Sequence, residues 1–299
     1  MHVQALTILV ELARSDSIRQ AAHRLKITPT AVSRQIDQLE HFFRAELIDR
    51  TSSGIQLTEA GRLLAERAQF ITNEIQVTQA LVDDLRGLQR GCATVRAGGA
   101  VVAGLLVPVV HDLHNRYPGL KFHIDVSNAG DVFSGVNDGV ADLGVTIFLP
   151  ESNKLMICHR QPVTHAAIVC PAHPFAALAS ISMKELAGVS LAIPDTTFGV
   201  RQNLERIARN SGVVLSPTFE TGSLDMQKEL AILGSTVLIL PPLCCRREIA
   251  SGLLVAVPLA VDSRIETTLD ICRASNRALP FAAQTLLKSL IAYMATHVK

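Results

Sequence analysis

The chain has 299 residues, of which 48% are hydrophobic and 18% are charged, and its formal net charge is +1. This length is enough for two or three domains, and the composition is typical of a globular protein rather than of a disordered or low-complexity chain. No run reaches the roughly 18 apolar residues that a membrane span needs. The N-terminal segment includes Glu11 and lacks the basic start and the cleavage site of a signal peptide, so we expect a cytoplasmic location and no membrane partner.

Six cysteines are present, at positions 92, 158, 170, 244, 245 and 272, and no two of them form a Cys-x-x-Cys motif. Zinc and thioredoxin-like sites commonly use that motif, so we expect no metal and no cofactor. In a reducing compartment the thiols should be free. The neighbouring Cys244 and Cys245 leave two interpretations open, a redox sensor or two packed thiols.

Positive charge is concentrated near the N-terminus. Residues 17–36 contain Arg19, Arg24, Lys26 and Arg34 and no acidic residue, which gives this segment a charge of +4. A local patch of this kind attracts phosphate groups. A solvated helix face can have the same composition, so charge alone does not decide between a nucleic-acid surface and an ordinary exposed helix.

Three helices are predicted at the start of the chain. Apolar residues recur at helical spacing over 6–13, and a serine shortly before residue 18 can cap a second helix that ends at Leu25. Thr28 is typical of an N-cap and Pro29 of the first helical position, so a third helix is predicted from Pro29 to about Phe43. Two short helices joined by a tight turn form a helix-turn-helix, whose second helix can enter the DNA major groove.

A hairpin wing is predicted next, over residues 50–57, and Thr58 then caps another helix. The positions that carry a longer pattern are Ala21-Ala22-His23-Arg24-Leu25, Thr28, Ser33-Arg34-Gln35-Ile36, Leu39-Glu40, Leu47, Arg50 and Leu57-Thr58-Glu59-Ala60-Gly61. With this fixed spacing the segment resembles the signature of LysR-type transcriptional regulators. The resemblance implies a winged helix-turn-helix whose DNA contacts come from Arg19, Thr28, Pro29, Thr30, Ser33, Arg34, Gln38, Arg50 and Ser53.

Within that set, Ser33 and Arg34 are the best candidates for base or phosphate contacts, and Arg50 and the wing for contacts with the DNA backbone. Ser33 can also be a helix-packing hydroxyl group. The chain departs from the family at Arg44, where glycine is usual and suits a left-handed turn. It departs again at Ile48, where phenylalanine is common, and at Pro29, where many members have glutamine. These changes affect the target sequence more than the fold.

A long helix is predicted from Thr58 to about residue 88, because the segment contains no proline and its two glycines lie near its ends. Its apolar side follows alternating spacings of four and three, through Leu64, Ala68, Ile71, Ile75, Thr78, Val82 and Leu85. We expect this seam to pair with a second copy, because paired helix-turn-helix units match symmetric half-sites. Packing on the chain's own domain is the alternative. The segment 87–91 should end the helix as a hinge.

Strands and helices alternate through the remaining two hundred or so residues, which predicts an α/β domain with a mostly parallel sheet. The predicted strands are 94–97, 122–126, 142–146, 165–170, 190–193, 218–220, 236–240 and 266–273. The predicted helices are 101–116, 132–138, a short helix opened by a capping box at 182–185, 200–210, 224–233 and 281–296.

Two α/β lobes with a late return of the chain resemble the type 2 periplasmic-binding-protein fold of LysR-type effector domains. The runs at 173–176 and 246–253 agree with that family. The fold class expected is therefore α/β, with a winged helix-turn-helix at 1–58, a linker and dimerisation helix at 59–90, and a two-lobed effector domain at 91–299. Lobe I would comprise 91–161 and 265–299, and lobe II would comprise 162–264.

In such folds a ligand binds at the carboxyl ends of the strands, between the lobes. The residues expected there are Gly98, Gly99, Ala100, Ser127, Asn128 and Thr146 from lobe I, with Thr196, Thr197, Phe198, Thr221 and Ser223 from lobe II. Backbone N–H groups at Gly99 begin a helix and could hold an organic anion. Many relatives carry a hydroxyl group near residue 99 or 100, whereas this chain does not. Each hydroxyl named above can also simply cap a helix.

Three rival functions are less well supported. No Gly-x-Gly-x-x-Gly before a helix, Walker lysine or His-Glu-x-x-His is present, so we expect no enzyme. An exported solute receptor would need a signal peptide, and a DNA-bending protein would not need a cleft-forming domain. We expect a regulator that binds double-stranded promoter DNA and a small-molecule effector, which would be a metabolite. It should form a homodimer, joined into a homotetramer through the effector domains, and the resemblance also allows RNA polymerase as a partner.

Overall fold

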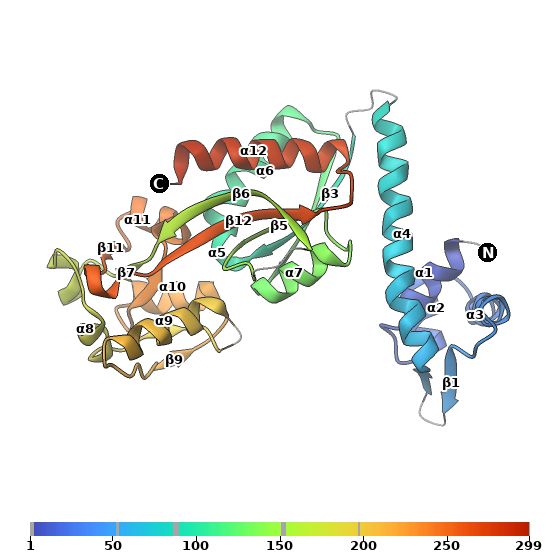
Figure 1. Cartoon of the computed structure of the whole chain (residues 1–299), viewed down its shortest axis with the longest axis horizontal. Coiled ribbons are helices and arrows are strands. Elements are labelled where there is room, and N and C mark those ends of the chain that lie inside the picture. The colour runs from blue at the N-terminus through green and yellow to red at the C-terminus, as the bar shows by residue number, and fades with distance from the viewer. Residues whose placement is uncertain (1–2, 52–53, 86–89, 151–153, 197, 299) are drawn as a thin grey trace. The chain divides into compact units, whose positions relative to one another are not determined.

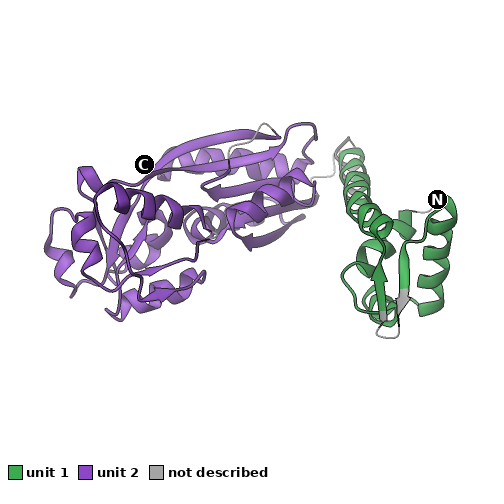
Figure 2. Ribbon diagram, turned by 60° about the horizontal axis from the view of Figure 1, so that its bottom comes forward, with its two compact units in different colours: residues 1–83 green, residues 84–299 purple. Residues whose placement is uncertain are grey.

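A computed structural model of the chain describes residues 3–51, 54–85, 90–150, 154–196 and 198–298. The chain divides into two compact units, Met1–Asp83 and Asp84–Lys299 (Figure 2). Each unit has its own buried apolar core. Among the described residues, no helix has both the length and the apolar character that a membrane crossing requires.

The first unit is a helical domain with a two-stranded wing (Figure 1). Its elements are α1 Val3–Leu12, α2 Ile18–Leu25, α3 Pro29–Phe43, β1 Ile48–Thr51, β2 Gly54–Leu57 and α4 Glu59–Leu85. β1 and β2 pair antiparallel. One face of each of the first three helices packs into a common core that also receives Ala65 and Ala68 from α4.

The helix boundaries follow local signals in the sequence. The hydroxyl of Ser17 accepts a hydrogen bond from the Gln20 N–H at the start of α2, and the hydroxyl of Thr28 accepts one from the Ala31 N–H at the start of α3. Both helices end in the left-handed conformation, at Lys26 with φ 55° and at Arg44 with φ 53°. The strained turn expected at Arg44 is therefore present, with arginine in a conformation that favours glycine.

The second unit begins with a lobe built on a five-stranded sheet in the order β4-β3-β5-β12-β6. β3 is parallel to β4 and β5, while β12 is antiparallel to β5 and β6. The strands are β3 Gly91–Gly98, β4 Leu120–Ser127, β5 Leu143–Ile147, β6 Leu155–Thr164 and β12 Glu266–Ala274. The helices are α5 Gly99–Val101, a π-helical turn Val102–Leu106, α6 Val107–Arg116, α7 Ala129–Asn137 and α12 Phe281–His297. Figure 1 shows α6 and α12 on one face of this sheet and α7 on the other.

The second lobe is centred on β7, which pairs antiparallel with β10 on one side and β11 on the other. β8 and β9 form a short parallel pair beside it. The elements are β7 Ala166–Val169, α8 Met183–Ala187, β8 Ala192–Ile193, α9 Gly199–Asn210, β9 Phe219–Glu220, α10 Leu224–Ile232, β10 Leu238–Leu240, α11 Arg246–Ala250 and β11 Val255–Pro258. Short 3-10 turns lie at Pro174–Ala177, Pro242–Cys245 and Val261–Ser263. The capping box predicted at Ser182 and Glu185 is confirmed.

Three features of this unit differ from the sequence expectations. The sheets are mixed rather than mostly parallel, since the long β12 returns antiparallel beside β5 and β6 and since β7 has two antiparallel neighbours. Strands β6 and β11 were not predicted. β6 lacks a regular alternation because it contains Pro162 and a bulge next to Cys158, which an edge strand tolerates. The lobe border expected between residues 161 and 162 falls inside β6.

Candidate nucleic-acid interface and ligand cleft

Helix α3 is amphipathic, and its outer face carries most of the residues expected to contact DNA. Val32, Ile36 and Leu39 are buried in the core of the first unit. The opposite face is polar, where Thr28, Pro29, Thr30, Arg34 and Gln38 are exposed and Ser33 is half-buried. The first turns of α3 therefore present a polar surface on a helix whose orientation is fixed by its buried side.

The basic residues of the 17–36 segment do not all have the same role. Arg24 donates to the Glu11 carboxylate at 3.1 Å and to the Arg14 carbonyl at 3.1 Å, so its guanidinium holds α2 against the end of α1. Arg19, Lys26 and Arg34 are exposed. Arg24 is exposed as well, but its guanidinium is engaged within the unit, so the other three cations are the candidates for phosphate contacts.

Several of the LysR-like signature positions are architectural. One carboxylate oxygen of Glu40 accepts hydrogen bonds from the Leu47 N–H at 2.7 Å and the Ile48 N–H at 3.3 Å, which fixes the loop between α3 and the wing. The Thr58 hydroxyl donates to the Glu46 carbonyl and accepts from the Gly61 N–H. A Cβ on Gly61 would lie 2.0 Å from the Leu47 carbonyl oxygen, so only glycine fits there.

Two wing residues among the DNA candidates are only partly described. The backbone of Arg50 lies in β1, paired with Ile55, and nothing is described of its side chain. Ser53, at the tip of the wing, lies outside the described residues. The hairpin itself is at the place that the sequence predicts, directly after α3 and before α4.

The seam expected along α4 is divided between two environments. Ala68 is buried and Leu64 half-buried in the first unit's own core, which is the alternative that the sequence left open. Farther along the helix, Ile71 is 38% exposed and Val82 is 45% exposed, and Ile75 is half-buried. Two large apolar residues outside the predicted seam, Leu63 and Phe70, are exposed as well. The Thr78 side chain is exposed, and nothing is described of the Leu85 side chain.

A cleft lies at the ends of the strands of the second unit and encloses about 730 Å³ of empty space, counting its open mouth. It receives residues from both lobes, because β3, β4 and β5 end on one side of it and β8, β9 and β10 on the other. Seven of the residues predicted for an effector site line this cleft: Gly98, Gly99, Ala100, Ser127, Asn128, Thr146 and Phe198.

The other predicted cleft residues do not line it. Thr196 is exposed, and its carbonyl accepts from the Gln202 side chain. The Thr221 hydroxyl accepts from the Ser223 N–H, and the Ser223 hydroxyl caps α10 by accepting from the Met226 N–H. These two hydroxyls stabilise local turns, because side chains of this kind readily bond to nearby backbone. Thr197 lies outside the described residues.

The sequence reading missed two prominent residues of the cleft, Phe148 and His165. Phe148 follows β5 with φ 65°, which is unusual for a bulky residue. Its ring lies 6.3 Å from the His165 ring, between centroids. His165 precedes β7 and is 2% exposed. The only signal in the sequence is a histidine at the edge of an apolar run, and most such residues are core histidines.

The electrostatic character of the cleft is neutral. Among the described residues that line it, none is Lys, Arg, Asp or Glu, and His165 is the titratable one. Burial lowers the pKa of His165 to about 4, although the Ile265 carbonyl group favours the charged form, so the imidazole is neutral at pH 7. Within the described part of the chain, no cluster of three or more His, Cys, Asp or Glu side chains is arranged to hold a metal ion.

None of the six cysteines is among the described residues that line the cleft, although Cys244 and Cys245 belong to the core cluster behind it. Cys244 and Cys245 are both fully buried, and burial raises the pKa of the Cys245 thiol to about 12 and that of Cys244 still further. A thiol that cannot ionise near pH 7 is a poor nucleophile. Of the two interpretations for this pair, the structure therefore favours packed thiols.

A helix-turn-helix unit joined to a two-lobed, cleft-containing unit defines a class of protein, the ligand-responsive DNA-binding regulators. Residues 3–62 match the family described as "Bacterial regulatory helix-turn-helix protein, lysR family", and residues 86–295 match the family described as "LysR substrate binding domain". The chain belongs to the LysR family of bacterial transcriptional regulators. It is a DNA-binding transcriptional regulator with an effector-binding domain.

Individual relatives are distant. The chain is 24% identical to a hydrogen peroxide-inducible genes activator of Pectobacterium carotovorum, over 83% of this chain and 82% of the relative. It is 25% identical to the uncharacterized regulator YfeR of Shigella flexneri, over 95% and 91% of the two chains. A full-length OxyR variant from Pseudomonas aeruginosa has a similar fold, with a TM-score of 0.72 at 19% identity over 97% of this chain and 94% of that chain. CbnR, a LysR family transcriptional regulator, has a TM-score of 0.69 at 15% identity over 98% of this chain and 99% of that chain.

Proposed function

We propose that the polar face of α3 reads promoter DNA, with Ser33 and Arg34 at its centre. The observation that carries this assignment is the division of α3 into a buried face and an exposed polar face that begins at a capped N-terminus. Thr28, Pro29 and Thr30 lie at that N-terminus, and Gln38 lies on the next turns. Arg19 and Arg50 supply phosphate contacts beside the groove.

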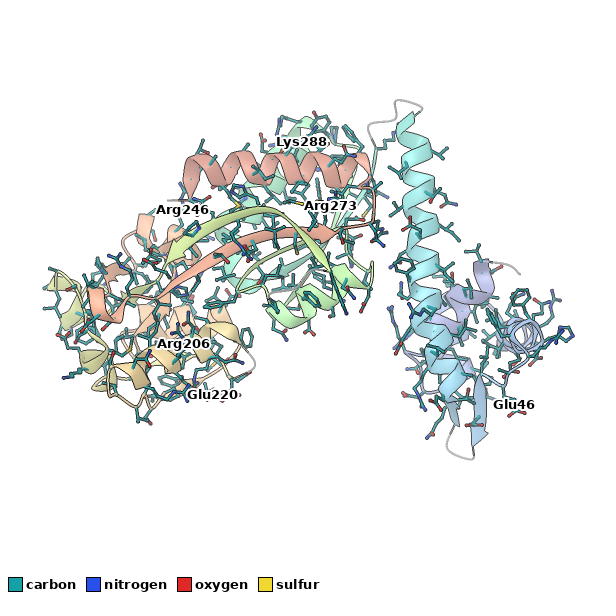
Figure 3. The ribbon with its side chains drawn as sticks, viewed as in Figure 1. Glu46, Arg206, Glu220, Arg246, Arg273 and Lys288 are labelled. Carbon is teal, nitrogen blue, oxygen red and sulfur yellow. The ribbon has the colours of Figure 1, made fainter. Side chains whose placement is uncertain are left out.

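The test is equilibrium DNA binding by the full chain at fixed salt. Arg34→Ala is expected to weaken binding to its own promoter fragment by about tenfold or more, because one phosphate or base contact is lost. Arg206→Ala is the matched control, since Arg206 lies on α9 of the second unit (Figure 3). Equal affinity of Arg34→Ala and the wild-type chain would refute the assignment of α3.

The exposed apolar side chains of α4 form the surface through which the chain pairs with a second copy. In the single chain, Phe70 is 42% exposed and Ile71 is 38% exposed, and Leu63 and Val82 of the same helix are exposed as well. A long helix with such a stripe is stabilised by burying it against a partner helix. Symmetric pairing also places two copies of α3 on two half-sites of one DNA duplex. A second dimer joins through the effector domains.

The corresponding experiment measures the mass of the full chain by sedimentation velocity. The double variant Phe70→Glu/Ile71→Glu is expected to lower the mass by half, because it places charges on the stripe. Gln79→Glu is the control on the same helix, since Gln79 is exposed and off the stripe. If the double variant has the same mass as the wild-type chain, α4 is not the surface through which two copies pair.

The cleft of the second unit is the effector site in this proposal, and ligand binding there alters the closure of the two lobes. A ligand can shift DNA binding only as far as it binds one arrangement better than the other. Peroxide is not the proposed signal, because none of the described cleft residues is a cysteine and the adjacent thiols are buried. The protein acts where promoter DNA is, in the bacterial cytoplasm, as a regulator rather than an enzyme.

A further inference from the structure

One buried polar atom of the cleft has no hydrogen-bond partner among the residues that the structure describes. The Nδ1 atom of His165 makes no hydrogen bond, although the residue is only 2% exposed and lines the cleft. Buried polar groups are nearly always paired, and one that is not lowers stability by about 1–3 kcal/mol. His165 therefore has a hydrogen-bonding capacity that the folded chain itself leaves unused.

A second unpartnered atom faces the cleft from the other lobe. The hydroxyl oxygen of Ser127 is buried without a hydrogen bond at the end of β4. The neighbouring Asn128 is occupied, because its side chain caps α7 and donates to Asp131. One unused polar atom from each lobe is thus available to a single molecule in the cleft.

Two phenyl rings form the aromatic part of an apolar lining that also includes Ile147, Leu224 and Leu240. Phe148 keeps its positive φ of 65° although this conformation is unfavourable by about 1–2 kcal/mol for a residue with a side chain. A Cβ on Gly199 would lie 3.1 Å from the Phe148 Cβ, and a Cβ on Gly222 would lie 3.3 Å from the tip of the Phe198 ring. Small residues from the second lobe therefore leave room for both rings, which suits a flat apolar ligand.

The charges around the cleft do not favour an anion. The buried cations of the second lobe are already paired, Lys228 with Glu248 at 3.2 Å and Arg201 with Glu205 at 2.5 Å and Glu220 at 3.2 Å. The N-terminal turns of α7 and α10 contain carboxylates of their own, Asp131 and Asp225, which occupy the positive ends of those helix dipoles. The first turn of α9, which lines the cleft at Gly199 and Val200, has no acidic residue and offers backbone N–H groups only. A carboxylate ligand would lose its hydration without gaining a cationic partner.

We propose that the effector is an uncharged hydroxyaromatic molecule, whose ring packs against Phe148 and Phe198 and whose hydroxyl group donates a hydrogen bond to His165 Nδ1. The Ser127 hydroxyl bonds a second polar atom of the same ligand. This inference rests on the proposed function, since it assumes that the cleft is the effector site. It replaces the organic anion that the sequence alone suggested.

Three naphthalene probes of matched size test the inference on the full chain. 2-Naphthol is neutral at pH 7 and carries a donor, 2-methoxynaphthalene lacks the donor, and 2-naphthoate is an anion. The chain contains no tryptophan, so naphthalene fluorescence reports binding without interference from the protein. We expect 2-naphthol to bind about five- to tenfold more tightly than 2-methoxynaphthalene, the factor that one hydrogen bond supplies, and more tightly than 2-naphthoate.

Variants assign the preference to a residue. His165→Phe is expected to abolish the advantage of 2-naphthol over 2-methoxynaphthalene. Ser127→Ala removes a hydroxyl that has no hydrogen bond among the described residues, so it should keep the fold and leave 2-naphthol binding unchanged, because that probe has no second polar atom. 2,6-Dihydroxynaphthalene has a second hydroxyl group and is expected to bind more weakly to Ser127→Ala than to the wild-type chain. His159→Phe is the control, because His159 also has a buried unpartnered ring nitrogen but does not line the cleft. If His165→Phe does not fold, His165→Leu answers the same question, because leucine also lacks a hydrogen-bond acceptor.

Each other outcome counts against the inference. Tighter binding of 2-naphthoate than of 2-naphthol would show that the cleft prefers an anionic ligand. An unchanged preference for 2-naphthol in the His165 variants would show that His165 does not bind the hydroxyl group of the ligand. No binding of any probe by a chain that still binds its promoter DNA would exclude the ligand class while leaving the DNA-binding function intact. A chain that binds the probes but no DNA would instead contradict the assignment of α3.

Discussion

His165 should make the stability of the second unit depend on pH. Its pKa is about 4 in the folded chain against 6.5 for an unperturbed histidine, because burial disfavours the imidazolium. Between these two pH values the unfolded chain binds a proton that the folded chain does not. The contribution of His165 to the free energy of unfolding is therefore fully present above pH 6.5 and is lost as the pH falls toward 4. The full difference corresponds to about 3 kcal/mol, of which about 2 kcal/mol is lost between pH 7 and pH 5.

Replacing His165 by glutamine removes the titrating group and keeps a polar side chain of similar length. Urea unfolding of wild type and His165→Gln, followed by circular dichroism at pH 7 and pH 5, measures the difference. We expect the wild-type chain to lose about 2 kcal/mol more than the variant over this range. All other titrating groups contribute equally to both chains. Parallel pH dependence of the two chains would refute the argument, since it would mean that His165 takes up its proton equally in both states.

Three further predictions concern local features. Arg44→Gly should stabilise the first unit by about 0.5–1 kcal/mol in thermal unfolding, because glycine adopts the left-handed conformation without strain. Gly61→Ala should destabilise the same unit by about 3 kcal/mol or more, since its Cβ would collide with the Leu47 carbonyl, and normal stability would contradict that contact. Thiol labelling of the native chain should modify the exposed Cys92 and spare Cys245; rapid modification of Cys245 would show that it is accessible.

The first unit could be predicted almost residue by residue because its signals are local. A threonine followed by proline sets the start of α3, and the left-handed residue Arg44 ends it. The polar face of α3 then follows from the spacing of the buried Val32, Ile36 and Leu39. The α4 seam was harder to predict, since helical spacing cannot tell that Ala68 packs on the chain's own domain while Ile71 remains exposed.

The cleft could be located but not characterised. Strand ends predict where it lies, because neighbouring parallel strands end at the same edge of a sheet, and Gly98, Ser127 and Thr146 all line it. His165 and Phe148 could not be found in this way. His165 follows β6, and this strand is hard to predict from the sequence because it contains a proline and a bulge. Phe148 reaches the cleft through a left-handed backbone conformation, which no residue pattern predicts. The neutral chemistry of the cleft depends on both.

The most direct test of the account maps the position of α3 on DNA. Ser33→Cys, in a chain in which Cys92 and Cys158 are replaced by serine, allows an iron chelate to be attached at the centre of the proposed reading face. The account predicts strand cleavage at two places on the promoter, about one helical turn or a multiple of it apart, as two copies of α3 in successive major grooves require. The same chelate at Ser251→Cys, which is exposed on the second unit, is the control. Diffuse cleavage from position 33, or cleavage no stronger than from position 251, would contradict it.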